Sequence, residues 1–578
     1  MTGDSRHAAA RDAIEAALVG DGAPFETEFA QVLGQQLRVW KHAPRDLRCL
    51  FAQAGSWGDA PALTYEGRTV TWNEYGDTVG GVAAGLVTDF GIKKGDRVAI
   101  AMRNYPEWAL AFAAAVSVGA IAVPLNSWWS ADELEFALGD SGSSLLFADH
   151  ERATLLRDRR GRLPLLRAVV EAEPEALAGD ASWKDAFSGA GASFDVDGVP
   201  MDTDDDATIL YTSGTTGRPK GAIATHRAHA TELMNILYQG EIHGAVNRER
   251  EVPVRPVRGP SQQLVAGPLF HVSNIPKLYV AAARGQHLIF MRRWEAAAAI
   301  DLIDGMGLDS FAGVPTMVRQ LLDEAEAVGT TMPSLRLIGT GGAPSPAAQI
   351  QRIASQFDRG VAPSTGYGLT ETTGAVLGIA SADFLERPVS FGRSFPTTEI
   401  RLLGPDGAPS ETGAVGEAWL RGPTLARAYW NRPAEDFAQD GWFRTGDLLS
   451  QDEDGFFRIV DRLKDVVIRG GENVYCAEVE RLLGTHPAVL DVAVLGMPHE
   501  VLGEEVAAVV QLREEMTASE SELREHVART AAAFKVPSLV VVMDAPLPRN
   551  PTGKVLKAKL RSYIESLRRI EEKVGHDT

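Results

Sequence analysis

One loop, Tyr211–Gly221, constrains this chain more than any other stretch. It reads Tyr-Thr-Ser-Gly-Thr-Thr-Gly-Arg-Pro-Lys-Gly and follows the apolar run Ala207–Leu210, which we expect to form a strand. Glycines let the backbone approach an anion, hydroxyls donate hydrogen bonds and lysine supplies a point charge. Ligands commonly bind at strand ends in α/β folds. The residues predicted to bind phosphate are Thr212, Ser213, Gly214, Thr215, Thr216, Gly217 and Lys220.

The loop is not a Walker A motif, in which the lysine follows glycine directly and precedes serine or threonine. Here Pro219 precedes Lys220 and Gly221 follows it. Composition alone would equally suit a flexible surface loop. The order of the residues, however, closely resembles the phosphate loop of the adenylate-forming superfamily. That superfamily comprises acyl-CoA synthetases, luciferases and the adenylation domains of peptide synthetases, and the resemblance implies ATP as a substrate.

Length and charge narrow the class of protein further. A chain of 578 residues is too long for one hydrophobic core. Its formal net charge of -20 argues against nucleic acid as a partner. The two cysteines, Cys49 and Cys476, cannot build a disulfide framework and favour a reducing compartment. The most apolar stretch, Ala109–Leu125, falls short of the ~20 residues of a membrane span. We therefore expect a cytoplasmic protein without a transmembrane segment.

Alternating patterns in the first part of the chain predict an α/β fold. Strands are expected at Ala62–Tyr65, Arg97–Met102 and Ile121–Leu125, and helices near Tyr75–Leu86 and Trp108–Val118. Such alternation indicates βαβ units and a mainly parallel sheet. The resemblance adds a large N-terminal domain of αβ-layered subdomains and a small mobile C-terminal α+β domain.

Three segments near the loop are less regular. The acidic stretch Glu151–Asp206 is interpreted as a solvated connection. Ala222–Leu237 is predicted to be a helix whose N-terminus faces the phosphates. Glu241–Gln262, which contains Arg248 and Arg250, is interpreted as a basic surface loop.

Further motifs of the superfamily follow in family order. His271 matches a residue near the reacting carboxylate, and Gly342-Ala343-Pro344 matches the turn that lines the adenine and acyl pocket. In Gly366-Tyr367-Gly368-Leu369-Thr370-Glu371 the resemblance implies that the tyrosine stacks on adenine. It also implies that Glu371 holds Mg²⁺ between the phosphates, which suits this hard cation. The ATP contacts implied here are Gly342, Ala343, Pro344, Gly366, Tyr367, Gly368 and Thr370.

Later motifs imply the ribose site, the hinge and the CoA channel. Asp447 would accept the ribose hydroxyls and Arg462 would contact ribose or phosphate. Lys464 falls on the pivot between the two domains, where a few residues absorb the rotation. Gly470, Gly471 and Glu472 match the pantetheine channel. The domains expected are an extension at 1–30, an AMP-binding domain at 31–463 and a C-terminal domain at 464–578.

Lys554, in the stretch Pro548–Lys554, resembles the catalytic lysine of the superfamily. The implied reaction has two steps: the acid attacks the α-phosphate of ATP, and the CoA thiol then attacks the acyl adenylate. We expect Lys554 to stabilise the charge that develops in the first step. The residues implied to be catalytic are Thr212, His271, Glu371 and Lys554.

The acid itself is constrained only by its expected pocket walls. These walls include Tyr238, Val272–Asn274, Gly313–Val314 and Thr340–Ala343, which are apolar or small and favour a hydrophobic acid without a second charge. A carrier protein instead of CoA as acceptor, a non-catalytic nucleotide-binding relative and a homodimer all stay open. Cys476 stands where relatives usually have proline, and we interpret it as a tolerated small residue.

Overall fold

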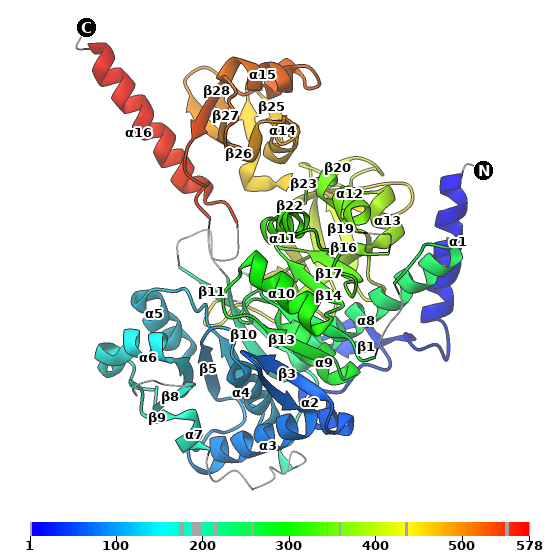
Figure 1. Ribbon diagram of the computed structural model, residues 1–578, viewed down its shortest axis with the longest axis vertical. Helices are drawn as coiled ribbons and strands as arrows, with labels where there is room; N and C mark the ends of the chain where they lie inside the picture. The colour runs from blue at the N-terminus through cyan, green and yellow to red at the C-terminus, as the bar shows by residue number, and fades with distance from the viewer. Residues whose placement is uncertain are drawn as a thin grey trace. The chain divides into compact units, whose positions relative to one another are not determined.

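The computed structural model separates into two compact units (Figure 1). The larger unit comprises Met1–Gly341, Ala347–Ile400 and Leu420–Phe443, and the smaller comprises Gly342–Pro346, Arg401–Trp419 and Arg444–Thr578. Within the described part of the chain, no helix combines the length and apolar character needed to cross a membrane. The residues that the structure describes are 3–172, 178–187, 198–212, 218–255, 259–343, 345–357, 360–433, 437–549 and 554–576.

A seven-stranded sheet, in the order β11-β10-β6-β5-β7-β8-β9, carries the phosphate loop. All neighbours in it run parallel except β10 and β11, which are antiparallel. Its inner strands are continuous apolar runs because both faces of a parallel sheet are covered. The helix α4 (Pro106–Ser117), buried along its whole length, packs against α3 (Trp72–Thr88). The strands are β5 (Arg97–Ala101), β6 (Ile121–Pro124), β7 (Leu145–Asp149), β8 (Ala168–Ala172), β9 (Ala181–Ser182), β10 (Asp206–Thr212) and β11 (Lys220–Thr225).

A nine-stranded sheet, β18-β17-β16-β15-β14-β12-β13-β3-β4, forms the rest of the larger unit's framework. The strands from β16 to β3 in this order run parallel, and β17, β18 and β4 are antiparallel at the two ends. The strands are β3 (Pro61–Tyr65), β4 (Arg68–Thr71), β12 (Gln262–Val265), β13 (His287–Phe290), β14 (Ser310–Gly313), β15 (Leu337–Thr340), β16 (Ala362–Leu369), β17 (Gly374–Ala380) and β18 (Arg393–Ser394). Its helices include α9 (Ile275–Arg284), α10 (Ala296–Met306), α11 (Pro315–Val328) and α12 (Ala347–Gln356).

The N-terminal segment packs onto the larger unit. The helix α1 (Gly3–Val19) lies against α8 (His226–Glu249), as Figure 1 shows in blue and green. The hairpin of β1 (Thr27–Val32) and β2 (Gln35–Trp40) follows it. Tyr238 of α8, expected to line the acid pocket, is 3% exposed and packs its ring among Phe25, Trp40 and Phe395.

A five-stranded sheet in the order β19-β20-β22-β21, with β23 beside β22, follows in the chain. The last sheet, β25-β24-β27-β26 with β28 beside β27, belongs to the smaller unit, and α16 (Lys557–His576) packs Leu560 and Ile564 against it. These strands are β19 (Glu399–Leu403), β20 (Val415–Arg421), β21 (Ala438–Gln439), β22 (Trp442–Gln451), β23 (Phe457–Arg462), β24 (Val467–Arg469), β25 (Glu472–Val474), β26 (Val489–His499), β27 (Gly503–Leu512) and β28 (Leu539–Met543). Its other helices are α14 (Cys476–Leu483) and α15 (Glu520–Ala528).

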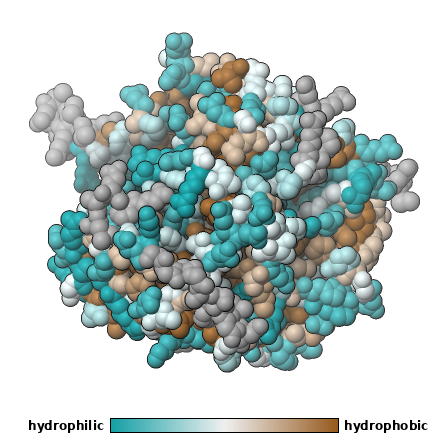
Figure 2. All heavy atoms as spheres, turned by 60° about the horizontal axis from the view of Figure 1, so that its bottom comes forward, coloured by the Kyte–Doolittle hydropathy of each residue, from teal (hydrophilic) through white to brown (hydrophobic). Residues whose placement is uncertain are grey.

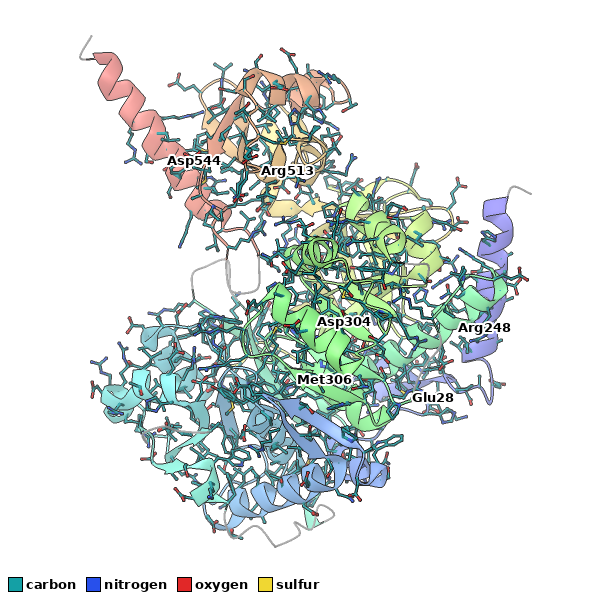
Figure 3. All side chains as sticks on the ribbon, in the orientation of Figure 1. Glu28, Arg248, Asp304, Met306, Arg513 and Asp544 are labelled. Carbon is teal, nitrogen blue, oxygen red and sulfur yellow. The ribbon has the colours of Figure 1, made fainter. Side chains whose placement is uncertain are left out.

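Two predictions for the segments that follow the phosphate loop are wrong. Residues 222–225 are not helical but complete strand β11, so a strand and not a helix N-terminus follows the phosphate loop. The helix α8 begins at His226, and it continues to Glu249 through part of the segment predicted as a basic loop. Arg248 is exposed on the last turn of α8 (Figure 3), whereas Arg250 is 8% exposed in its side chain and lies 2.9 Å from Asp383.

The acidic stretch before the loop is also more structured than predicted. It contains α6 (His150–Leu156) and the strand β8, every residue of which is buried. The strands and helices predicted between residues 62 and 125 are confirmed within a few residues.

On the face drawn in Figure 2, hydrophilic side chains surround smaller apolar patches.

Candidate active site

The predicted phosphate loop connects two antiparallel strands. Thr212 ends β10, Lys220 begins β11, and the two residues are direct partners in the register. Tyr211 anchors the end of β10, because its hydroxyl donates to Oδ2 of Asp140 at 2.6 Å. The structure thus brings Thr212 and Lys220 together. Outside the described residues lie Ser213, Gly214, Thr215, Thr216 and Gly217.

Glu371 and Lys220, predicted from separate motifs, share one neighbour that the sequence analysis missed. The hydroxyl of Tyr429 donates a hydrogen bond to Oε1 of Glu371 at 2.7 Å. Nζ of Lys220 lies 5.0 Å from the centroid of the Tyr429 ring. Tyr429 is 8% exposed, so both contacts are made by a largely buried side chain. A carboxylate and a lysine therefore contact the same side chain near the phosphate loop.

This donor set fits Mg²⁺ that arrives with a nucleotide. Among the described residues, no group of three or more His, Cys, Asp or Glu side chains could hold a metal ion. In nucleotide sites Mg²⁺ usually binds one or two carboxylates, phosphate oxygens and water. Glu371 supplies a carboxylate of this kind, and bound Mg²⁺ would neutralise phosphate charge there.

The turn that carries Glu371 depends on close backbone contacts. A Cβ on Gly368 would lie 1.8 Å from the carbonyl oxygen of Gly374 on the paired strand, so only glycine fits. A Cβ on Gly366 would lie 3.0 Å from the carbonyl oxygen of Leu377. Thr370 then begins the short 3₁₀ helix Thr370–Thr372.

Two other segments were predicted to contact the nucleotide. Tyr367 is 6% exposed and lies edge-on to Phe391, with ring centroids 6.5 Å apart. Gly342 follows β15 with a φ of 79°, a left-handed conformation that glycine adopts without strain. Ala343 comes next in the turn, and Pro344 lies outside the described residues.

His271 lies in the turn that precedes α9. Its Nδ1 accepts a hydrogen bond from the backbone N–H of Ser273 at 3.3 Å and lies 2.8 Å from Oγ of the same residue. An accepting Nδ1 leaves the proton of a neutral ring on Nε2. With its proton on Nε2, His271 can donate a hydrogen bond to a carboxylate.

Asp447 and Arg462 also come from separate motifs, and the structure brings them together. They are paired partners on β22 and β23, and Nε of Arg462 lies 3.0 Å from Oδ1 of Asp447. Asp447 is 3% exposed, and its N–H donates to Oγ1 of Thr445 at 3.0 Å. The carboxylate is therefore held in one orientation, as recognition of a ribose requires.

The predicted hinge and CoA residues lie close together in the sequence of the smaller unit. Lys464 is the middle residue of a short 3₁₀ helix between β23 and β24. Gly470 and Gly471 turn the chain between β24 and β25 with φ values of 61° and 90°. Glu472 begins β25, and the N–H of Gly470 donates to the carbonyl of Leu502 at 2.8 Å.

Cys476 contacts the residue that follows the predicted hinge residue Lys464. It is the first residue of α14, it is 0% exposed, and its Sγ donates to the carbonyl of Asp465 at 3.0 Å. Burial raises the pKa of the thiol to about 12. A buried, protonated thiol agrees with a packing role and not with a nucleophile.

Lys554 is exposed and lies on a loop that is fastened near both ends. Before the undescribed residues 550–553, Arg549 forms a β-bridge with Val555 and an ion pair of 2.6 Å with Asp491. After Lys554, Nζ of Lys557 lies 2.9 Å from Oε1 of Glu480 on α14.

A hairpin that carries the predicted phosphate loop in an α/β unit, and an exposed lysine loop in a small α+β unit, are the features expected of a nucleotide-dependent ligase. The family model described as AMP-binding enzyme matches residues 50–430. The model described as AMP-binding enzyme C-terminal domain matches residues 478–554. The chain therefore belongs to the family of AMP-binding enzymes.

Curated relatives and a solved structure agree with this membership. The long-chain-fatty-acid–CoA ligase FadD13 of Mycobacterium tuberculosis is 35% identical, over 84% of this chain and 91% of its own. A feruloyl-CoA synthase of Amycolatopsis sp is 34% identical, over 87% of this chain and 95% of its own. The o-succinylbenzoate CoA synthetase of Bacillus subtilis, solved with ATP and magnesium, is 29% identical over 88% of this chain and 98% of its own, with a TM-score of 0.73.

These findings confirm the predicted fold class, a large α/β N-terminal domain with a small C-terminal domain. They also confirm the predicted activity class. The protein is an acid–thiol ligase of the acyl-CoA synthetase type, and ATP, Mg²⁺ and CoA are its cofactor and co-substrates.

Proposed function

We propose that the protein activates a hydrophobic acid, fatty, alicyclic or aromatic, as its acyl adenylate and then transfers the acyl group to CoA. The observation that carries the first step is that Lys220 and Glu371 both contact Tyr429 beside the loop, which supports phosphate and metal binding at this place. The names of the two relatives, for long-chain fatty acids and for the feruloyl group, support an acid with an apolar body.

The residues divide the chemistry between them. A carboxylate oxygen of the acid attacks the α-phosphorus, the bond to the bridging oxygen breaks, and pyrophosphate leaves. Lys220 and the phosphate loop, from Thr212 onward, hold the departing phosphates, and Glu371 holds the Mg²⁺ that accompanies them. Lys554 stabilises negative charge between the carboxylate and the α-phosphate. His271 orients the carboxylate through Nε2.

We assign the remaining predicted residues to the nucleoside and to CoA. Asp447, fixed by Arg462, accepts the ribose hydroxyls, and Tyr367 with the turns at Gly342–Pro344 and Gly366–Thr370 lines the adenine site. In the second step the CoA thiol attacks the acyl carbonyl, AMP leaves, and Gly470–Glu472 lines the pantetheine path. We place the working boundary between domains 31–463 and 464–578 at Lys464, with 1–30 as an extension.

Two further proposals concern the protein's location and its oligomeric state. The two cysteines, both free in the structure, support a cytoplasmic location, where disulfides are rare. We also propose a homodimer, which light scattering on the eluting peak of a size-exclusion column distinguishes from a monomer.

A panel of acids tests the function. The purified protein is incubated with ATP and Mg²⁺, with and without CoA, and pyrophosphate, AMP, acyl adenylate and thioester are measured. We expect apolar acids to release pyrophosphate, and CoA to convert the adenylate to thioester with release of AMP. Accumulation of acyl adenylate without thioester for every accepted acid would identify a carrier protein as acceptor instead.

A further inference from the structure

The residues 426–430 run along the free side of the strand that follows the phosphate loop. The N–H of Trp430 donates to the carbonyl of Gly221 at 2.7 Å, and the N–H of Ile223 donates to the carbonyl of Ala428 at 2.9 Å. Ala222 and Tyr429 form an antiparallel bridge. β11 is therefore paired on both sides, with β10 on one and with this stretch on the other.

This pairing places the Tyr429 ring against Lys220. Side chains two residues apart on a strand share a face, so Lys220 lies on the same face as Ala222, which is opposite Tyr429. The measured distance from Nζ of Lys220 to the ring centroid is 5.0 Å, within the range of a cation–π contact. The ammonium is thus attracted to the ring face independently of any ligand.

The same stretch holds Glu371 at two points. The N–H of Ala426 donates to the backbone carbonyl of Glu371 at 2.8 Å. The Tyr429 hydroxyl donates to Oε1 of the Glu371 side chain at 2.7 Å. A hydrogen bond to one carboxylate oxygen fixes the rotation of the group and so determines how its acceptor sites are presented.

We propose that Tyr429 is a positioning residue that holds both the metal carboxylate and the phosphate lysine through separate parts of one side chain. Its hydroxyl orients Glu371 toward Mg²⁺, and its ring restrains Lys220 toward the phosphates. The inference rests on the proposed roles of Glu371 and Lys220 and adds the residue that coordinates them.

Two substitutions separate the two contacts. Tyr429→Phe removes the hydroxyl and keeps the ring, whereas Tyr429→Leu removes both. ATP binding is measured by calorimetry without acid or CoA, first in EDTA and then over a series of MgCl₂ concentrations. We expect Tyr429→Phe to bind ATP like the parent in EDTA and to need about 10–100-fold more Mg²⁺ for tight binding. Tyr429→Leu should show the same Mg²⁺ shift and, in EDTA, a roughly 3–10-fold loss of ATP affinity.

Trp430→Phe provides the matched control. Its indole Nε1 donates to the carbonyl of Asp140 at 3.0 Å, so this variant loses one hydrogen bond from the same stretch without altering either contact of Tyr429. Both titrations should match the parent for Trp430→Phe. An unchanged Mg²⁺ titration for Tyr429→Phe, or equal shifts for Tyr429→Phe and Trp430→Phe, would overturn the proposal.

A further variant distinguishes a failure of this proposal from a failure of the proposed function on which it rests. Glu371→Gln should raise the Mg²⁺ requirement at least as much as Tyr429→Phe. If Glu371→Gln leaves that requirement unchanged, the metal role of Glu371 is wrong. If Glu371→Gln shifts it and Tyr429→Phe does not, Glu371 keeps its role and only the positioning by Tyr429 is refuted.

Discussion

The two lysines proposed to serve the first step, Lys220 at the phosphates and Lys554 at the reacting carboxylate, are held in different ways in the two units. Lys220 begins a strand that is paired on both sides, and its ammonium lies over an aromatic ring. Lys554 is exposed on a loop whose flanks are fastened by ion pairs, one of them between Lys557 and Glu480. A sheet fixes the first lysine through many backbone bonds, so one lost contact should change its function without unfolding it. The loop of the second is held at its base by one β-bridge and a few charged contacts.

The largest effect expected is that of removing Lys554 itself. Lys554→Ala should slow pyrophosphate release from acid and ATP by about 10²–10³, because one preorganised charge at the reacting phosphate is lost. With synthetic acyl adenylate and CoA, thioester should form at nearly the parental rate. Lys559→Ala, a change at an exposed lysine of the following helix α16, serves as control. Equal slowing of both half-reactions by Lys554→Ala would contradict a role confined to the first.

An intermediate effect is expected at Lys557. Burial lowers its pKa, but Glu480, Cys476 and Asp465 together raise it more, so the net pKa is raised and the side chain stays charged. Lys557→Met keeps the length and loses the charge. We expect pyrophosphate release to fall roughly tenfold, because loss of the ion pair should shift Lys554 slightly. A shift of about 1 Å in a catalytic group can slow a reaction about 10²-fold, so a smaller shift should slow it less.

The conservative variant and a double substitution check that interpretation. Lys557→Arg should keep most of the activity because it keeps the ion pair with Glu480. Adding Glu480→Gln to Lys557→Met should restore part of the thermal stability, since no unpaired carboxylate then remains. If Lys557→Met is as active as the parent, the Lys554 loop does not depend on this ion pair, and the contrast between the units fails.

The smallest effect concerns a carboxyl behind the Glu371 turn. Glu232 of α8 is 3% exposed, and its Oε1 accepts from the N–H of Ala375 at 3.1 Å. Burial raises its pKa to about 8. The folded protein therefore keeps a proton that the unfolded chain loses above about pH 4.5, so stability falls as pH rises through this window, by at most ~1.4 kcal/mol per pH unit.

Denaturant midpoints at pH 5.5, 6.5 and 7.5 measure this dependence. Glu232→Gln should flatten the decline seen in the parent, whereas Lys557→Met should leave the slope unchanged, because Lys557 remains charged over this range. Parallel slopes for the parent and Glu232→Gln would show that the carboxyl is ionised in the folded protein.

Local sequence patterns predicted most of the fold. The strands at Ala62–Tyr65, Arg97–Met102 and Ile121–Leu125 were predicted to within one residue of the bounds that the structure has, since short apolar runs carry a strong local signal. Residues 222–225 were predicted wrongly because a short alanine-rich run suits either conformation. Hydrogen bonding to β10 and to residues 426–430 makes these residues a strand. The second partner lies about 200 residues further along the chain, so a local pattern does not reveal it.

The residues of the candidate site could be predicted from the sequence where each stands in a motif of its own. Lys220, Glu371 and Asp447 each stand in a recognisable run, whereas Tyr429 stands in a run whose composition suggests only packing. Its two partners lie on other strands and turns, and only the folded chain shows that one ring meets a lysine while its hydroxyl meets a carboxylate.

The two cysteines give the protein a built-in reporter of local opening. Cys49 is partly exposed, whereas Cys476 is fully buried against Asp465, with a thiol pKa near 12. Alkylating reagents attack the thiolate, so at neutral pH they should label Cys49 first and Cys476 only in molecules whose α14 has opened. The rate at which intact protein gains its second label would therefore measure how often α14 opens. The measurement needs neither a substitution nor an attached probe.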